Sequence, residues 1–256
     1  MLLLIAIPIW VSWVAIASAR FACAEGQLRG ANITAVSAGE SGGVTEVARP
    51  LTGRRLIKLL GDRNILLNTI SYLCTNYLYY LLSFWSFLYL VQVRHFSGIE
   101  AGMVGALPWI GAGVGAAAGG FLSDWLAERI GVRWGYRLVP LLTLPAAGLL
   151  LLVTLRVATP YAAVAALTVA FFMVEINEGA YWATMMRVAR SDIAAASGVL
   201  NTGANVGGII AQPLVGFLTN SGAWGGAFMT GIVFALVAAG HQCPLPGAEF
   251  IFRARF

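Results

Sequence analysis

The chain has 256 residues, of which 59% are hydrophobic and only 11% are charged. A soluble domain carries about 25% charged residues, so this composition argues against a water-soluble globule. The net charge is +5, and the three cysteines (Cys23, Cys74 and Cys243) lack the paired spacing of a zinc site or a disulfide framework. With only two histidines in addition, we expect neither a metal site nor a cofactor.

Long stretches without a charged residue divide the chain into seven hydrophobic segments. These stretches are 1–19, 64–93, 101–123, 138–155, 157–174 and 193–248. A membrane-spanning helix needs about 20 apolar residues, so each of the first five stretches fits one helix. The fifth continues past Glu175 to about Met186, and the last fits two helices separated by turn-forming residues at 219–225. The pattern predicts an all-α integral membrane protein, a bundle of about seven transmembrane helices.

The segments also suggest four regions. Residues 1–19 form a first transmembrane helix, and residues 20–63 form a connection that is rich in small residues and then basic. Residues 64–243 form a six-helix unit, and residues 244–256 form a tail. Near the end of the connection we expect an interfacial helix at 51–60, with its cations toward lipid headgroups.

Charge placement indicates the topology. Threading the segments alternately through a membrane places 14 of the 16 Lys and Arg residues on one side, and only Arg94 and Arg156 on the other. Cytoplasmic loops carry the excess of basic residues. We therefore expect a plasma membrane protein, in a bacterium an inner membrane protein, with its N-terminus outside and its C-terminus in the cytoplasm.

Three stretches resemble the major facilitator superfamily. Residues 120–131 carry the pattern G-x-L-S-D-x-L-x-x-R-x-G, which is similar to the loop signature of that superfamily. Residues 76–90 resemble the seventh helix, and residues 198–208 the eleventh helix, of its anion:cation symporter family. The resemblance covers roughly residues 1–240 and implies helices six to twelve of a twelve-helix fold.

This resemblance implies a function. It is that of a secondary active transporter, a proton- or sodium-coupled symporter of small organic anions such as sugar acids. It further implies that the first five helices are missing and that the chain is truncated, so that an absent N-terminal half is a partner. The tail also departs from the family pattern.

Glu175 and Glu178 are acids inside a predicted span. Their i,i+3 spacing places both on one helix face, and a charge at the membrane centre costs about 2.5–3.5 kcal/mol or more. They either face a cavity as proton acceptors or pair with an arginine at the helix end, such as Arg187. Both interpretations stay open for Glu175. Glu178, which precedes the aromatic residues Tyr181 and Trp182, is the candidate for proton coupling.

A sugar-acid site needs hydrogen-bonding groups beside an aromatic ring. Tyr79 and Tyr80 offer both in one helix, and Trp182 adds a third ring. The resemblance to the eleventh helix adds Asn201. The alternative for these residues is interhelical hydrogen bonding or an aromatic belt, which we prefer for Tyr72. No Lys or Arg falls at mid-membrane depth, so the cation for a substrate carboxylate is expected from the absent half.

The charged segment after the glycine-rich span has a conformational role in the family that it resembles. Its candidate residues are Gly120, Asp124 and Arg129. Asp124 is expected to favour the N-terminus of a neighbouring helix or to pair with Arg129. The seven glycines of residues 102–120 predict close helix packing and not a phosphate cradle, since no lysine or acidic metal ligand follows.

Two other classes of protein compete with a transporter. A polytopic membrane enzyme would need clustered His, Asp or Cys at a membrane face, and neither histidine has such a cluster. A seven-span receptor fits the number of segments and the topology, but not the charged signature or the long first cytoplasmic connection. We therefore expect a transporter and not an enzyme. Its expected partners are the bilayer and a small organic anion, with no role for nucleic acid.

Overall fold

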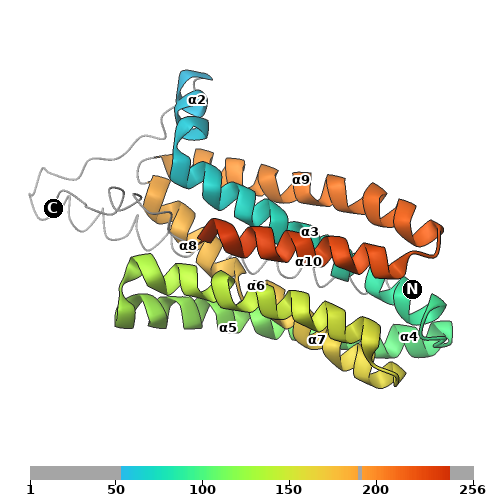
Figure 1. Cartoon of the computed structure of the whole chain (residues 1–256). Helices are drawn as coiled ribbons and strands as arrows, with labels where there is room; N and C mark the ends of the chain where they lie inside the picture. The colour runs from blue at the N-terminus through green and yellow to red at the C-terminus, as the bar shows by residue number, and fades with distance from the viewer. Residues whose placement is uncertain (1–52, 190–191, 243–256) are drawn as a thin grey trace, which may run out of the picture. The chain divides into compact units, whose positions relative to one another are not determined.

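The computed structural model describes residues 53–189 and 192–242, and helices are the regular structure of these ranges (Figure 1). In chain order they are α2 (Gly53–Gly61), α3 (Arg63–Gln92), α4 (Gly98–Val104), α5 (Ala106–Ile130), α6 (Val132–Arg156), α7 (Pro160–Glu175), α8 (Glu178–Ala189), α9 (Ile193–Asn220) and α10 (Trp224–Gln242). The expected all-α architecture is confirmed for this part of the chain. The first predicted helix, most of the connection and the tail lie outside the described residues.

Within residues 53–189 and 192–242, five helical stretches are long and apolar enough to cross a membrane. They are Gly98–Ile130, Val132–Arg156, Pro160–Ala189, Ile193–Asn220 and Trp224–Gln242. The chain is thus a helical membrane bundle, as its hydrophobic segments predict. Helix α3 has 30 residues, enough to span a bilayer at about 1.5 Å per residue, but it is not among the five. Asn, Ser and Thr recur along α3, and many of the polar contacts described below involve this helix.

Local signals in the sequence explain where several helices begin and end. The Asp62 side chain accepts hydrogen bonds from the backbone of Asn64 (2.8 Å) and Ile65 (3.3 Å), which caps the start of α3. The segment expected to form a charged loop is helical as far as Ile130. Gly131 alone separates α5 from α6, with φ of 88°, a conformation that glycine adopts without strain.

The long helices form two groups that meet along α3, α7 and α8. Helix α3 packs against α9 and α10, and α5 packs against α6 and α7 (Figure 1). Helices α6 and α10 contact each other and close one side of the bundle. On the other side α9 packs on α3 and α8, and α5 packs on α7 and α8, with no comparable α5–α9 contact in the described part. We call the surface of α3 and α8 between α9 and α5 the open face.

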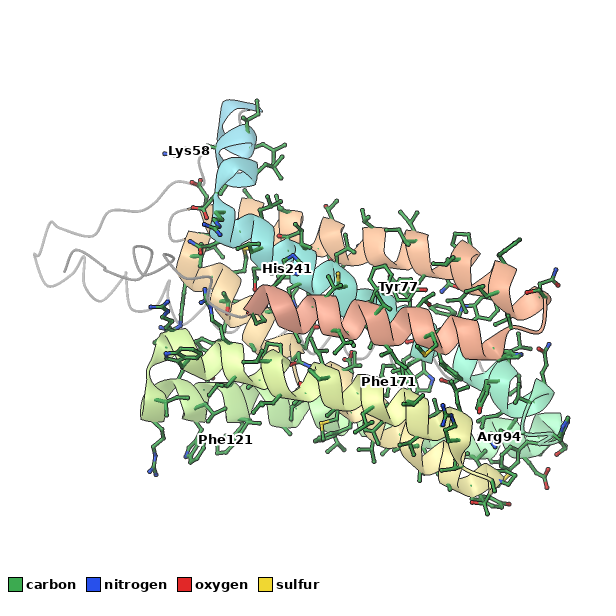
Figure 2. All side chains as sticks on the ribbon, in the orientation of Figure 1. Lys58, Tyr77, Arg94, Phe121, Phe171 and His241 are labelled. Atoms are coloured by element: carbon green, nitrogen blue, oxygen red, sulfur yellow. The ribbon has the colours of Figure 1, made fainter. Side chains whose placement is uncertain are left out.

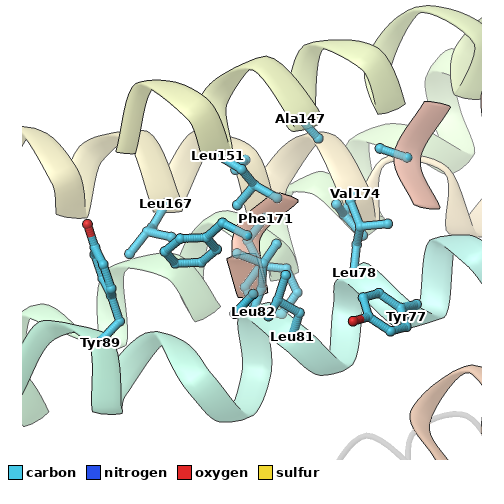
Figure 3. Close-up of a cluster of buried hydrophobic side chains, with 14 of the residues drawn as sticks. Tyr77, Leu78, Leu81, Leu82, Tyr89, Ala147, Leu151, Leu167, Phe171 and Val174 are labelled. Carbon is cyan, nitrogen blue, oxygen red and sulfur yellow. The ribbon is translucent and has the colours of Figure 1, made fainter. Parts of the chain in front are cut away.

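The core lies where α3 meets α7. Figure 3 shows Leu78, Leu81 and Leu82 of α3 beside Leu167 and Phe171 of α7, all of them buried. Large apolar side chains also cover the outside of the bundle. A membrane-spanning bundle is expected to expose such residues, because lipid tails surround it.

Glycines let α5 approach α7 closely. Gly111, Gly115 and Gly119 recur every four residues, so they lie on one side of α5. A methyl group built at Gly115 would lie 2.5 Å from the carbonyl oxygen of Phe172. Gly111 is similarly crowded by the Thr168 backbone of α7, and Gly119 by the backbone of Ile176, just after α7. The expected close packing of this glycine-rich span is confirmed at these three positions. Gly113, between them, faces open space.

The stretch Pro160–Ala189 is interrupted near its middle, between α7 and α8. Ile176 and Asn177 form a turn there. The buried Asn177 amide donates to the carbonyls of Met173 (2.8 Å) and Val174 (3.1 Å), and its oxygen accepts from Thr143 of α6 (2.9 Å). One side chain therefore supplies hydrogen bonds to backbone carbonyls beside the break. Such bonds are needed because backbone polar groups at membrane depth have no water to bind.

Cations gather at the two ends of the bundle. The basic end, where α3 and α6 begin and α5, α8 and α10 finish, carries Arg63, Arg129, Arg133, Arg137 and Arg187. At the opposite end, Arg94 donates to Tyr89 (3.0 Å) and to the carbonyls of Val157 (2.8 Å) and Thr154. It thereby connects the end of α3 to the end of α6; Figure 2 labels Arg94 at this end.

The glycine packing predicts a position-dependent effect on stability. We expect Gly115→Val to destabilise the bundle, because the valine side chain would overlap α7; such overpacking costs about 1–3 kcal/mol. Gly113→Val introduces the same side chain one half-turn away, into open space, and serves as the control. Thermal unfolding of the purified proteins in lipid nanodiscs measures the difference. Equal destabilisation by the two substitutions would contradict the role assigned to Gly115.

Candidate functional site

The candidate site begins with a polar row on α3. Tyr72, Asn76, Tyr79 and Tyr80 follow one another at helical spacing, so they lie near one side of the helix. The Asn76 amide donates to the backbone oxygen of Tyr72 (3.0 Å), within the same helix. The row extends from the first part of α3 to its middle.

Glu178 of α8 is held by two hydrogen bonds. The Tyr72 hydroxyl donates to its Oε1 atom at 2.6 Å, and the Trp182 indole nitrogen donates to the same atom at 2.7 Å. The Tyr72 and Trp182 rings pack edge to face, 6.3 Å between centroids. Hydrogen bonds to a charged acceptor are about twice as strong as neutral ones. The structure therefore fixes one carboxylate oxygen of Glu178 and leaves Oε2 without a described partner.

Glu175 differs from Glu178 although it lies on the same span. It is the last residue of α7, immediately before the break, and it interacts electrostatically with Tyr79 and Glu178. Within residues 53–189 and 192–242 its side chain has no hydrogen bond or ion pair. The alternative in which Arg187 pairs with one of these acids is wrong, because neither acid forms an ion pair with it in the described part of the chain. Arg187 donates to the Tyr136 hydroxyl (3.2 Å).

The two predicted tyrosines have different neighbours. The Tyr79 ring packs edge to face against Trp109 of α5 (6.4 Å) and Phe171 of α7 (5.6 Å). The Tyr80 hydroxyl lies 3.5 Å from the side-chain oxygen of Asn205 on α9, at the outer limit of a hydrogen bond. Tyr79 thus lies toward the α5 side of the open face, and Tyr80 toward its α9 side.

Asn201 and Asn205 are both exposed on α9. The Asn205 amide donates to the backbone oxygen of Asn201 (2.8 Å), one turn earlier. The Asn201 side chain makes no hydrogen bond to any described residue. Gly208, further along α9, lies under the Tyr80 ring, where a methyl group would come within 2.6 Å of a ring carbon. The glycine therefore lets this helix approach α3 beside the site.

The predicted site residues do not form a single cluster of direct contacts. Trp182 and Glu178 form one group with Tyr72. Tyr79 and Tyr80 form a second group, about two turns further along α3, with Glu175 between the groups. Asn201 borders the open face without a side-chain contact to either. Glu175 and Glu178 lie near the middle of the stretch Pro160–Ala189, and Tyr79 and Tyr80 lie near the middle of α3, which corresponds to the centre of a bilayer.

Asp124 has a partner that sequence reasoning missed. The Tyr136 hydroxyl donates to Asp124 (2.8 Å) and accepts from Arg187, so Tyr136 connects α5, α6 and α8 at the basic end. The alternative in which Asp124 pairs with Arg129 is wrong, because these side chains form no ion pair within the described residues. Arg129 lies over the Trp125 ring, 5.3 Å from its centroid. Asp124 therefore takes part, through Tyr136, in the contacts that connect the ends of α5, α6 and α8.

Gly120, the third residue of the predicted conformational segment, lies against α8. A methyl group at Gly179 would come within 2.8 Å of the Gly120 backbone, whereas one at Gly120 itself would meet open space. Close approach of α5 and α8 therefore depends on Gly179, which sequence reasoning did not select for this purpose.

Tyr72 and Asn177 were also not among the predicted site residues. The sequence favours interhelical bonding or an aromatic belt for Tyr72, although its spacing from Asn76 and Tyr79 also fits the same row. Asn177 lies between Glu175 and Glu178, but no sequence signal marks it as the residue that satisfies a helix break. In the described part of the chain, no three His, Cys, Asp or Glu side chains could hold a metal ion together.

Comparisons with known proteins relate the chain to membrane transporters. It is 29% identical over 175 residues to the hexuronate transporter of Bacillus subtilis, which covers 66% of the chain and 42% of that relative. It is 32% identical over 183 residues to the probable galactarate/D-glucarate transporter GudP of Escherichia coli, covering 71% of the chain and 40% of the relative. A probable sulfoacetate transporter, SauU of Cupriavidus necator, is 31% identical over 134 residues, which are 51% of the chain and 30% of the relative.

No family model matches the chain. The chain spans about two fifths of the length of the first two relatives. All three relatives are named as transporters and none as an enzyme, which agrees with the expectation that this chain is not an enzyme. The chain is therefore similar to transporters of sugar acids and other organic anions. Its assignment to the C-terminal half of the anion:cation symporter fold stays a prediction.

Proposed function

We propose that this chain forms one helical half of a secondary active transporter for small organic anions such as sugar acids. The observation that carries the proposal is a carboxylate at membrane depth, Glu178, beside an open face of hydroxyl, amide and aromatic groups. Similarity to transporters of such anions supports it. A seven-span receptor or a polytopic enzyme is not favoured by these relatives.

The substrate contacts follow from the chemistry of the open face. A sugar acid carries several hydroxyl groups, which need hydrogen-bonding partners, and a ring or chain that packs on aromatic surfaces. Tyr79, Tyr80 and Trp182 would supply rings with a polar edge. Asn201, whose side-chain amide has no described partner, would supply both a donor and an acceptor.

The carboxylate of the substrate needs a cation that these helices lack at mid-depth. The described Lys and Arg residues of the spanning helices lie near the helix ends. We therefore place the cation on a second helical half, packed against the open face. Two repeated helical halves that enclose a site near the bilayer midplane are a common transporter architecture.

Glu178 is the proposed coupling residue, with a proton as the coupling ion. Tyr72 and Trp182 both bind Oε1, so a proton can reach Oε2 without displacing either donor. Protonation removes a charge that is costly at this depth. Glu175, which has no described hydrogen-bonding partner, lies close enough to sense that change.

The interruption between α7 and α8 would link protonation of the glutamates to movement of α8. Glu175 ends α7 and Glu178 begins α8, so both carboxylates flank the turn at Ile176–Asn177. We propose that this turn is where α8 changes its angle during transport, since hinges are short non-helical positions of this kind. The contacts of Asp124 with Tyr136, and of Tyr136 with Arg187, would hold the basic end in one conformation. We place that end in the cytoplasm because of its positive charge.

Uptake of a labelled sugar acid tests the proposed function. A bacterial strain without its own galactarate uptake would express the chain together with the remaining helices of the Escherichia coli relative. We expect uptake with both parts and none with either alone, because the cation must come from the second part. Uptake by the purified chain in liposomes would contradict the half-transporter model. Absence of uptake by two parts that co-purify would contradict transport of this substrate class.

The role of Asn201 predicts a change in apparent affinity. In the two-part transporter we expect Asn201→Ala to weaken it roughly 2- to 13-fold, because one hydrogen bond to a neutral partner contributes about 0.5–1.5 kcal/mol. Asn220→Ala, the same substitution at the far end of α9, should have no effect. Substrate-concentration curves of initial uptake measure both. Equal affinity of the Asn201 and Asn220 variants would show that Asn201 does not contact substrate.

The coupling role of Glu178 predicts a different effect. Glu178→Gln retains an Oε1 that accepts from Tyr72 and Trp182, but it cannot take up a proton. We therefore expect loss of uptake driven by a pH gradient, with exchange of internal for external substrate retained. Glu128→Gln, an exposed glutamate of α5 near the basic end, is the control. Unchanged gradient-driven uptake in the Glu178 variant would reject its coupling role, and a dependence on sodium in place of pH would reject the proton.

A further inference from the structure

A small pocket opens at the basic end, away from the substrate-facing residues. It lies among the start of α3, the start of α6 and the ends of α8 and α10. The polar lining residues include Asn64, Arg133, Tyr136, Arg137, Arg187 and His241. None of the residues proposed to bind substrate or proton lines it.

The pocket concentrates positive charge without a carboxylate on its wall. Arg133 and Arg137 are one turn apart on α6 and repel each other, and Arg187 reaches the same space from α8. No Asp or Glu is among the lining residues, and these three arginines form no ion pair with a described residue. The first turn of α6 adds the positive end of its helix dipole. The site is therefore built to receive an anion.

The polar groups around the arginines are suited to an oxyanion. Arg187 is positioned by the Tyr136 hydroxyl (3.2 Å) and by the Tyr136 ring, 5.3 Å from its guanidinium carbon. The His241 Nδ1 atom lies 2.7 Å from the backbone oxygen of Val237, which can only accept, so Nδ1 carries the hydrogen. The Asn64 side-chain amide has no hydrogen-bonding partner among the described residues.

The volume of the pocket and its depth in the membrane further limit which anion can bind. The cavity volume of about 40 Å³ holds about three water molecules at ~10–15 Å³ each, which suits one compact oxyanion and not a sugar acid. Helix α6 has 25 residues, so it is about 37 Å long against a hydrocarbon core of about 30 Å. Its first turns, with Arg133 and Arg137, therefore reach the level of the lipid headgroups.

We propose that this pocket binds a phosphate group, presented by the headgroup of an anionic phospholipid. The phosphate oxygens would accept from the three guanidinium groups, which match phosphate geometry well. A lipid bound there would join α6 to α8 and neutralise the repulsion between Arg133 and Arg137. The proposal depends on the bundle lying in a membrane and not on the identity of the transported anion.

Lipid binding to the purified full chain tests this site. Native mass spectrometry would compare phosphatidylglycerol, which is anionic, with phosphatidylcholine, whose phosphate is offset by a choline cation. We expect the parent chain to prefer phosphatidylglycerol. Arg133→Gln combined with Arg137→Gln should weaken that binding roughly tenfold or more, as expected for two cations near an anionic surface. Arg129→Gln removes a charge from the same end but outside the pocket, so it should weaken the binding less than the double substitution does.

Competition with inorganic phosphate shows whether the bound phosphate group comes from a lipid headgroup or from free phosphate. Displacement of phosphatidylglycerol from the parent chain by millimolar phosphate would show that free phosphate also occupies the site. Lack of displacement would identify the lipid as its ligand. Equal weakening by the Arg129 variant and the double variant would overturn the proposal, as would equal binding of the two lipids by the parent chain.

A second measurement covers the case in which the double variant does not fold. The parent chain and the Arg129→Gln chain would be unfolded thermally in nanodiscs with and without phosphatidylglycerol. We expect the anionic lipid to raise the melting temperature of both chains by the same amount. No rise in the parent chain would overturn the proposal without any use of the double variant.

Discussion

A carboxylate near the centre of a membrane helix must be hydrogen-bonded, neutralised or hydrated, and the arrangement of α3, α7 and α8 follows this constraint around Glu178. Tyr72 and Trp182 satisfy one of its oxygens from two helices. The break between α7 and α8 leaves backbone carbonyls that need hydrogen-bond donors. Asn177 donates to two of them, and Thr143 of α6 donates to the Asn177 side-chain oxygen. Directional hydrogen bonds from three helices thus determine how the two groups of helices pack against each other, which apolar packing alone would determine less closely.

Close approach of the helices makes these polar contacts possible. In lipid, apolar side chains gain little from leaving their surroundings, so helices associate through tight packing and hydrogen bonds. Gly115 and Gly119 bring α5 against the last turns of α7, and Gly179 brings it against α8. The glycines therefore hold α5 at the site, where Trp109 packs on Tyr79. Packing and candidate function depend on the same short interhelical distances.

Much of the fold could be predicted from the sequence, because charge-free apolar stretches of about 20 residues predict membrane-spanning helices directly. The glycine spacing also predicted close packing correctly. The α7–α8 break could not be foreseen, since hydrophobicity continues on both sides of it and a single buried amide compensates for it. The Asp124–Tyr136 contact was missed because the two residues face each other across the one-residue connection at Gly131. Which residues meet a substrate stays a prediction, because that surface is exposed in this chain.

The contacts of Arg94 have a mechanical consequence. One guanidinium group binds the carbonyls at the end of α6 while its own backbone continues from α3, so these two helices are clamped together at the end opposite the basic one. Bending of α3 relative to α6 is therefore restrained there, and relative displacement grows with distance from the clamp. The bundle would behave as a pair of arms fixed at one end, with the largest amplitude of opening at the arginine-rich end.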